Sequence, residues 1–158
     1  MKDFLVDPFK KFDKEWALVC AGTKQDFNAM TISWGSFGTL WGKSVVSIYV
    51  RPQRHTLKFL KQEDFFSVSF YDEKFRKELS VFGTKSGADC DKPKLTGFRP
   101  KFFNNFVTFE QAKQTIVCKK LYCAQLDKTK VDASVKQFYN DLEDDAHFLI
   151  VGEVVDIL

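Results

Sequence analysis

The chain has 158 residues, of which 44% are hydrophobic, and its 24 Lys and Arg residues exceed its 21 Asp and Glu residues by a net charge of +3. A chain of this length buries enough surface to fold without a disulfide or a metal. No apolar run approaches the roughly 20 residues of a membrane-spanning helix, and basic residues alternate with acidic ones, so we expect neither membrane nor nucleic-acid binding.

Several runs rich in β-branched or aromatic residues predict strands, and 18 phenylalanines also favour sheet. In chain order the predicted strands are Trp16–Ala21, Met30–Trp34, Val45–Val50, Phe65–Phe70, Thr115–Leu121 and Phe148–Leu158. The predicted helices are Thr56–Gln62, Glu73–Phe82 and Val131–Leu142. For the second helix we expect Asp72 as the N-cap and Gly83 in the left-handed position after its end.

These elements predict a mainly β protein with short helices. Short helices at the corners between strands favour a small closed barrel over a parallel βαβ sheet. No repeat, low-complexity tract or linker interrupts the chain, so we expect one domain over residues 1–158.

The first polar cluster is Asn28-Ala29-Met30-Thr31-Ile32-Ser33-Trp34, at the entry to a predicted strand. Asn28 tolerates unusual backbone angles, and the amides after it are placed to face a ligand. An ordinary turn with an Asx-type hydrogen bond explains the same residues, and the sequence leaves both interpretations open.

The second cluster is Arg51-Pro52-Gln53-Arg54-His55-Thr56, directly before a predicted helix. A helix N-terminus offers free N–H groups and a favourable dipole, and arginine makes bidentate contacts with phosphate. This cluster therefore predicts a phosphate cradle, with a solvated charged turn as the alternative.

The third cluster is the loop Gly83-Thr84-Lys85-Ser86-Gly87-Ala88-Asp89-Cys90-Asp91-Lys92. Its glycines let backbone amides approach an anion closely, and loops of this kind often carry function. A flexible surface loop of mixed charge is the alternative interpretation.

The sequence offers no set of catalytic side chains. No Ser or Cys is paired by spacing with His55 or His147, and for His147 we expect a structural role. Glu143, Asp144 and Asp145 form a solvated acidic run. Any chemistry should therefore be carried by a cofactor.

Four cysteines, at positions 20, 90, 118 and 123, form no CxxC pair and have no His at ligand spacing, so we expect no metal site. The first 16 residues lack the apolar core of a signal peptide, which favours a cytoplasmic protein with reduced thiols. We expect Cys20 and Cys118 to be small apolar core residues.

Several short segments, spread from about residue 8 to the C-terminus, match the pattern of one protein family in the same order. They are Trp16 to Val19, Ala21-Gly22, Phe27 to Gly35, Leu40-Trp41, Val50 to Thr56, Ser69-Phe70, Gly83 to Gly87, Asp91-Lys92, His147 and Gly152-Glu153. With these segments the chain resembles the flavin reductase-like, FMN-binding split-barrel family, in its flavoredoxin-like subgroup. It departs from the family at His55, where relatives often have Tyr, and at Phe82, where many have Cys. Residues 101–110 and 128–145 match less clearly and are expected to shape a partner or substrate surface.

The resemblance implies a six-stranded antiparallel split β-barrel that forms a homodimer with one FMN per subunit near the interface. It implies that the flavin ring lies against Asn28, Met30, Thr31, Ser33 and Trp34. It implies that the phosphate is held by Arg51, Arg54 and Thr56, with Ser86 and Lys92 closing over it. Ala29, Gln53 and Gly83 complete the expected cofactor-binding residues.

The activity implied by the resemblance is a flavin oxidoreductase in which NADH or NADPH passes a hydride to FMN, with no catalytic side chain. One alternative is an electron-transfer flavoprotein that a partner protein reduces. Another is a barrel that binds no flavin and acts as a ligand-binding or nucleic-acid module, because small barrels host many functions.

Overall fold

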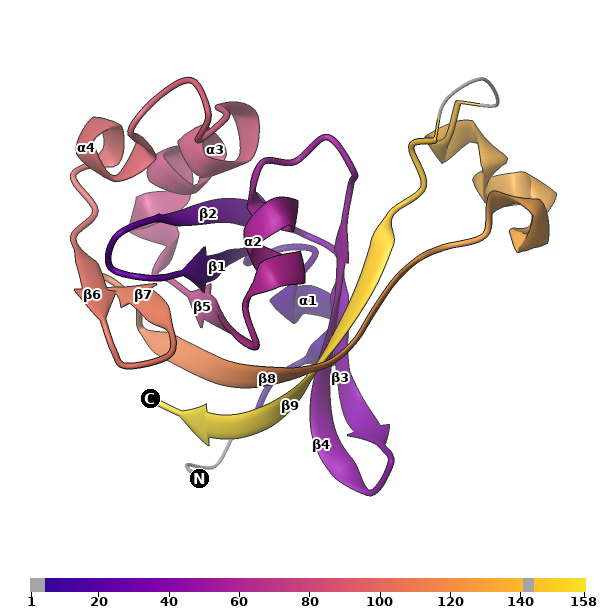
Figure 1. Ribbon diagram of the computed structural model, residues 1–158, viewed down its shortest axis with the longest axis horizontal. Helices are drawn as coiled ribbons and strands as arrows, with labels where there is room; N and C mark the ends of the chain where they lie inside the picture. Colours follow the sequence, from indigo (N-terminus) through magenta and orange to yellow (C-terminus); the bar gives the residue numbers. More distant parts are fainter. Residues whose placement is uncertain (1–4, 141–143) are drawn as a thin grey trace.

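The computed structural model describes residues 5–140 and 144–158, and its main feature is a seven-stranded antiparallel sheet with the order β2-β1-β5-β8-β9-β4-β3 (Figure 1). The strands of this sheet are β1 (Ala17–Gly22), β2 (Phe27–Ile32), β3 (Gly35–Leu40), β4 (Lys43–Val50), β5 (Phe65–Phe70), β8 (Gln114–Gln125) and β9 (Phe148–Ile157). A second, two-stranded sheet pairs β6 (Pro100–Phe102) with β7 (Val107–Phe109). The predicted class, a mainly β split barrel with short helices, is confirmed, although the main sheet has one strand more than the six expected.

Strand β1 separates two hydrophobic cores, which is why all six of its residues are buried. Val19 and Ala21 face the barrel interior, whereas Leu18 and Cys20 face a second core between the sheet and the helices. Phe82, Phe98 and Phe109 of that second core pack with ring centroids 5.4–5.6 Å apart. A continuous apolar run in the sequence thus marks a strand that is covered on both faces.

The cysteines expected in the core are buried there. Cys20 is 1% exposed and Cys118 is fully buried, and burial raises the pKa of both thiols. All four cysteines are free.

The helices match the predictions unequally. Helix α2 has the predicted bounds, Thr56–Gln62. The second predicted helix is a 3-10 turn, Glu73–Phe75, followed by α3, Arg76–Thr84. The left-handed role predicted for Gly83 is wrong, because the helix continues through it and closes where the Lys85 N–H donates to the Val81 carbonyl.

The expected N-cap of that second helix is also different. Asp72 precedes the 3-10 turn but makes no side-chain capping bond, and its carboxylate pairs with Lys113 at 3.3 Å. Two further short helices, α1 (Pro8–Lys11) and α4 (Lys92–Thr96), each follow a capping aspartate and contain a proline in the first turn. None of the helices in the described ranges is long and apolar enough to cross a membrane.

Residues between β8 and β9 form an arm that stands away from the barrel (Figure 1). It carries two 3-10 helices, Lys128–Lys130 and Ala133–Phe138, where the sequence predicted one helix over residues 131–142. The last two residues of that prediction, and Glu143 of the acidic run, lie outside the described ranges. Aspartates that cap successive short turns, including Asp127 and Asp132, favour two 3-10 segments over one long helix.

One lysine on β8 fixes the C-terminal end of α2. The Lys120 ammonium donates to the carbonyls of Leu60, Lys61 and Glu63 at 2.9, 2.8 and 2.7 Å. Replacing Lys120 by Met should lower the free energy of unfolding by about 1–2 kcal/mol, because charge-assisted bonds to the last carbonyls of the helix are lost. Urea unfolding measures this effect, and Lys119→Met, at the exposed neighbouring position, is the matched control. Equal stability of the two variants would contradict the assigned role.

Candidate functional site

The second and third sequence clusters meet in a cavity of about 150 Å³ between the segment before α2 and the loop after α3. We call it the basic cavity, and its lining residues are Asn28, Gln53, Arg54, His55, Thr84, Lys85, Ser86, Gly87 and Lys92. Three of these nine side chains are Lys or Arg and none is acidic. The fold therefore brings Arg54 together with Lys85 and Lys92, which lie more than 30 residues further along the chain. The resulting cavity is basic and has room for a small anion.

Arg54 is held in place by the end of α3. Its Nη1 donates to the Gly83 carbonyl at 2.7 Å and its Nη2 to the Phe82 carbonyl at 3.3 Å. Burial lowers the pKa of Arg54, but a guanidinium keeps its charge at neutral pH. The side chain is thus a fixed positive charge at the cavity wall.

Lys92 is the first residue of α4 and is 2% exposed. Its Nζ donates to the Phe82 carbonyl at 3.3 Å and lies 5.6 Å from the centre of the Phe82 ring. Burial, and then repulsion by Arg54, lower the pKa of Lys92 to about 8. Within the described chain neither Lys92 nor Arg54 pairs with a carboxylate, so the cavity holds positive charge that an anion would neutralise.

Asn28 and Gly87 make the closest contact between the first and third clusters. The Asn28 Nδ2 donates to the Thr56 Oγ1 at 2.9 Å, and both residues are buried. A Cβ atom on Gly87 would lie 2.1 Å from the Asn28 Oδ1, so only glycine lets the loop lie this close to β2. Thr56 itself lines neither this cavity nor the one described next, and its Oγ1 accepts the bond from Asn28.

A second cavity, of about 250 Å³, follows the end of β2 and shares Arg54 with the basic cavity. We call it the strand cavity, and it is lined by Met30, Thr31, Ile32, Ser33, Trp34, Tyr49, Arg51, Arg54, Phe138 and His147. The Thr31 Oγ1 is fixed by donating to the Leu79 carbonyl of α3. Its aromatic walls suit a flat ring, and the shared Arg54 places that ring beside the basic cavity.

His147 closes the strand cavity on the side of the arm. Its ring centroid lies 4.9 Å from that of Trp34, and its Nδ1 lies 3.1 Å from the Tyr139 hydroxyl. Burial, and then the nearby Arg51, lower the pKa of His147 to about 4. The imidazole is therefore neutral at pH 7, with one ring nitrogen that donates a hydrogen bond and one that accepts.

The other sequence-predicted residues are placed differently. Arg51 lines the strand cavity, but its guanidinium donates to the Phe138 carbonyl at 2.9 Å and lies 3.7 Å from Asp145, so it faces the arm and not the basic cavity. Ala29 packs in the second hydrophobic core. Gly83 lines neither cavity and contributes only its carbonyl, to Arg54.

Several lining residues were not among the predicted set. Lys85 and Gly87 were in the third cluster but were not singled out. Tyr49 could have been found, because it alternates with the buried Ile48 and Val50 on β4 and so faces the other side of the sheet. Phe138 could not have been identified from the neighbouring sequence, since its position depends on how the arm folds.

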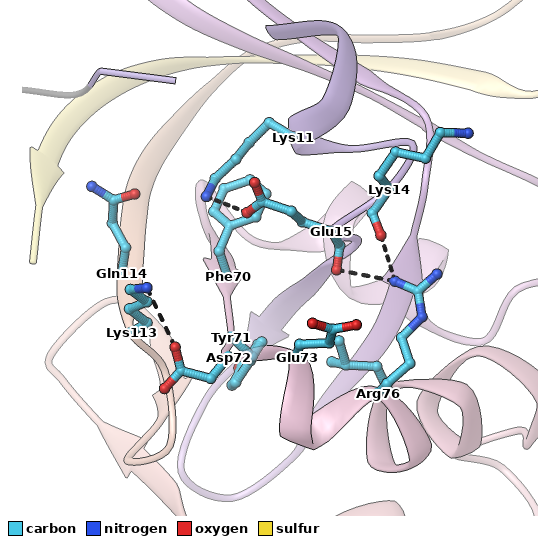
Figure 2. Close-up of a pocket in the computed structure, with 11 residues that line it drawn as sticks. Lys11, Lys14, Glu15, Phe70, Tyr71, Asp72, Glu73, Arg76, Lys113 and Gln114 are labelled. Carbon is cyan, nitrogen blue, oxygen red and sulfur yellow. Dashed lines mark hydrogen bonds and ion pairs between the residues drawn. The ribbon is translucent and has the colours of Figure 1, made fainter. Parts of the chain in front are cut away.

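A larger cavity, of about 700 Å³, lies elsewhere and includes none of the predicted site residues (Figure 2). Two of its lysines are paired with carboxylates: Lys11 with Glu15 at 2.6 Å and Lys113 with Asp72 at 3.3 Å. Arg76 donates to the Lys14 carbonyl at 2.6 Å, as Figure 2 shows. Because three carboxylates, Glu15, Asp72 and Glu73, line the same cavity, its volume alone does not make it the better anion site.

An antiparallel split barrel with a basic cavity joined to an aromatic one defines a class of proteins suited to a flat, phosphorylated cofactor. The family model of the flavin reductase like domain matches residues 9–158, and the chain belongs to this family. The resemblance drawn from the sequence is thereby confirmed.

Solved structures with the same fold share little sequence with this chain. A flavoredoxin from Methanosarcina acetivorans matches with a TM-score of 0.72 at 16% identity, over 100% of this chain and 75% of its own. An FMN-binding protein from Thermus thermophilus, with bound 1-cyclohex-2-enone, matches with a TM-score of 0.71 at 19% identity, over 100% and 80%. The styrene monooxygenase flavin reductase from Pseudomonas putida S12 matches with a TM-score of 0.64 at 16% identity, over 91% and 79%. No curated protein sequence matches the chain.

Proposed function

We propose that residues 1–158 act as one FMN-binding domain and that the protein is a flavin oxidoreductase that takes a hydride from NADH or NADPH. The observation that carries the proposal is a buried Lys92 and a half-buried Arg54, neither paired with a carboxylate of the described chain, in a cavity that shares Arg54 with the aromatic strand cavity. A phosphate would neutralise that charge, and a flat ring would fill the neighbouring space. The residues present therefore fit FMN.

In this proposal the chain's own residues bind and orient, and FMN when bound supplies the acceptance and onward transfer of electrons. Arg54, Lys92 and Ser86 hold the phosphate, with Gln53 at the exposed edge of the cavity. Met30, Thr31, Ser33 and Trp34 contact the ring and exclude water from one side of it. Between the phosphate site and the ring site, the hydrogen bond from Asn28 to Thr56 holds β2 and the start of α2 together.

An electron-transfer flavoprotein, reduced by a redox partner protein, is the second candidate. Trp34 and Phe138 line the strand cavity and are 41% and 44% exposed. A partner could therefore approach the rim of the cavity without displacing the barrel. This candidate needs no productive nicotinamide site.

One spectroscopic experiment tests both candidates. The purified protein is mixed with FMN, desalted, and titrated anaerobically with NADH, NADPH and then dithionite. Retained yellow absorption that a nicotinamide bleaches supports the oxidoreductase, and colour that only dithionite bleaches supports electron transfer. Failure to bind FMN in a direct titration would contradict both and favour a non-flavin barrel.

We also propose that the protein is a cytoplasmic homodimer. Leu40 and Trp41, at the β3–β4 turn, are 39% and 60% exposed, and a two-fold interface would bury such apolar side chains. The four free cysteines suit a compartment where thiols stay reduced. A monomeric mass in sedimentation at micromolar concentration would contradict the dimer.

The close approach of Gly87 to β2 predicts a selective defect. The Cβ of Gly87→Ala displaces Asn28 and breaks its bond to Thr56, so the dissociation constant for FMN should rise about 3- to 10-fold, the equivalent of one hydrogen bond. Flavin fluorescence titration measures this change. Gly38→Ala is the matched control, because a Cβ there meets nothing within 4 Å. Identical affinities of the two variants would contradict the prediction.

A further inference from the structure

An apolar cavity of about 520 Å³ lies between α1, the start of β3 and the arm, and no function has so far been assigned to it. Its walls are mainly apolar, with Phe9, Phe12, Leu126 and Val135 among them. None of its lining residues, all within the described ranges, is Lys or Arg, and its single carboxylate, Asp13, pairs with Lys14 at 2.6 Å. The volume is in the range of small-molecule sites. The chemistry of the walls suits an uncharged ligand.

This cavity lies next to the strand cavity and shares part of its wall. Ser33, Trp34, Tyr49, Phe138 and His147 line both. A molecule in the apolar cavity therefore touches the same side chains as a ring in the strand cavity. The position is that of a second reactant beside the proposed flavin.

The walls of the apolar cavity also offer a small polar group. The Tyr139 hydroxyl and the neutral His147 lie 3.1 Å apart, and both line the apolar cavity together with Ser33. A carbonyl oxygen could accept a hydrogen bond from this group while its carbon frame contacts the apolar walls. An anionic dinucleotide finds no cation among these walls, so its phosphates would have to lie elsewhere.

We propose that the apolar cavity binds an uncharged, flat carbonyl compound of the quinone class as the electron acceptor. This inference rests on the proposed function. A quinone becomes a hydroquinone by gaining two electrons and two protons. Reduced FMN supplies a hydride, which carries both electrons and one proton, and solvent supplies the second proton.

Binding of duroquinone is the direct test, because its ring carbons are all substituted and it does not alkylate thiols. Val135 is 39% exposed and lines the apolar cavity but none of the other cavities described above. Val135→Trp should therefore fill the apolar cavity and leave the others unchanged. Calorimetry on the FMN-loaded protein should show saturable binding that Val135→Trp weakens about tenfold or more. Val155→Trp, on β9 at 43% exposure, is the matched control and should bind as the wild type does.

Two further measurements separate the possible failures. FMN affinity should be the same in both variants. Failure of the unmodified protein to bind FMN would overturn the proposed function but not the ligand assigned to the apolar cavity, because duroquinone binding can also be titrated without FMN. Absence of saturable duroquinone binding, or equal binding by both variants, would overturn the inference. If Val135→Trp instead abolishes a wild-type dimer and no duroquinone binds, the cavity is an interface between subunits and the inference is wrong.

Discussion

Arg54→Ala is expected to raise the dissociation constant for FMN about 10- to 100-fold, since a charge-assisted contact with phosphate contributes about 1.5–3 kcal/mol. The guanidinium lies at the boundary of the basic and strand cavities, already oriented by the Gly83 and Phe82 carbonyls. Because the Arg54 side chain is already held by these carbonyls, little of that free energy is lost in ordering it on binding. Quenching of flavin fluorescence in a titration measures the constant.

Two variants separate the phosphate contact from the support that Arg54 gives to α3. Arg99→Ala removes an exposed guanidinium that is ion-paired with Glu110 and should leave FMN affinity unchanged. Arg54→Lys keeps the charge but loses the bidentate geometry, so its affinity should fall between those of the wild type and Arg54→Ala. Wild-type retention of FMN by a folded Arg54→Ala protein would remove Arg54 from the site.

The parts of the fold that the sequence predicts are those whose causes are local. Strand β5 and helix α2 have the predicted bounds, because an apolar run and a proline-marked start identify them. Strand β3 was missed, since Gly35–Leu40 holds two glycines, is exposed over most of its length and is a strand through its pairing with β4. A pairing partner that lies outside the segment contributes nothing to the composition of the segment itself.

The same division applies to the candidate site. Arg54, Ser86 and Lys92 could be chosen as candidate anion ligands by residue type, and the structure brings them to one cavity. Arg51 has the same chemistry, yet its guanidinium is drawn to the Phe138 carbonyl of the arm. Local sequence does not reveal where the arm folds back, so neither that contact nor the aromatic wall at Phe138 was predictable.

The pH dependence of FMN binding should report the charge of Lys92. Its pKa in the free protein is about 8, and the ammonium form is the one that attracts phosphate, which is largely dianionic above about pH 7. The dissociation constant should therefore rise by only about twofold between pH 7 and pH 8. Above the pKa of Lys92 a proton must be taken up for binding, so the dissociation constant should rise by about tenfold by pH 9. Fluorescence titrations across this range give the profile.

The stability of the FMN-free protein should change in the opposite direction. Because the pKa of Lys92 is lowered from 10.5 to about 8 on folding, the unfolded chain binds more protons between these values, and the free energy of unfolding gains a contribution that rises with pH across that window. Lys92→Met should abolish both trends, whereas Lys92→Arg should keep binding independent of pH up to pH 9. The two opposite trends have one cause, the burial of an ammonium that only an anion can compensate. An unchanged pH profile of FMN binding in Lys92→Met would show that another group titrates and that Lys92 does not hold the phosphate.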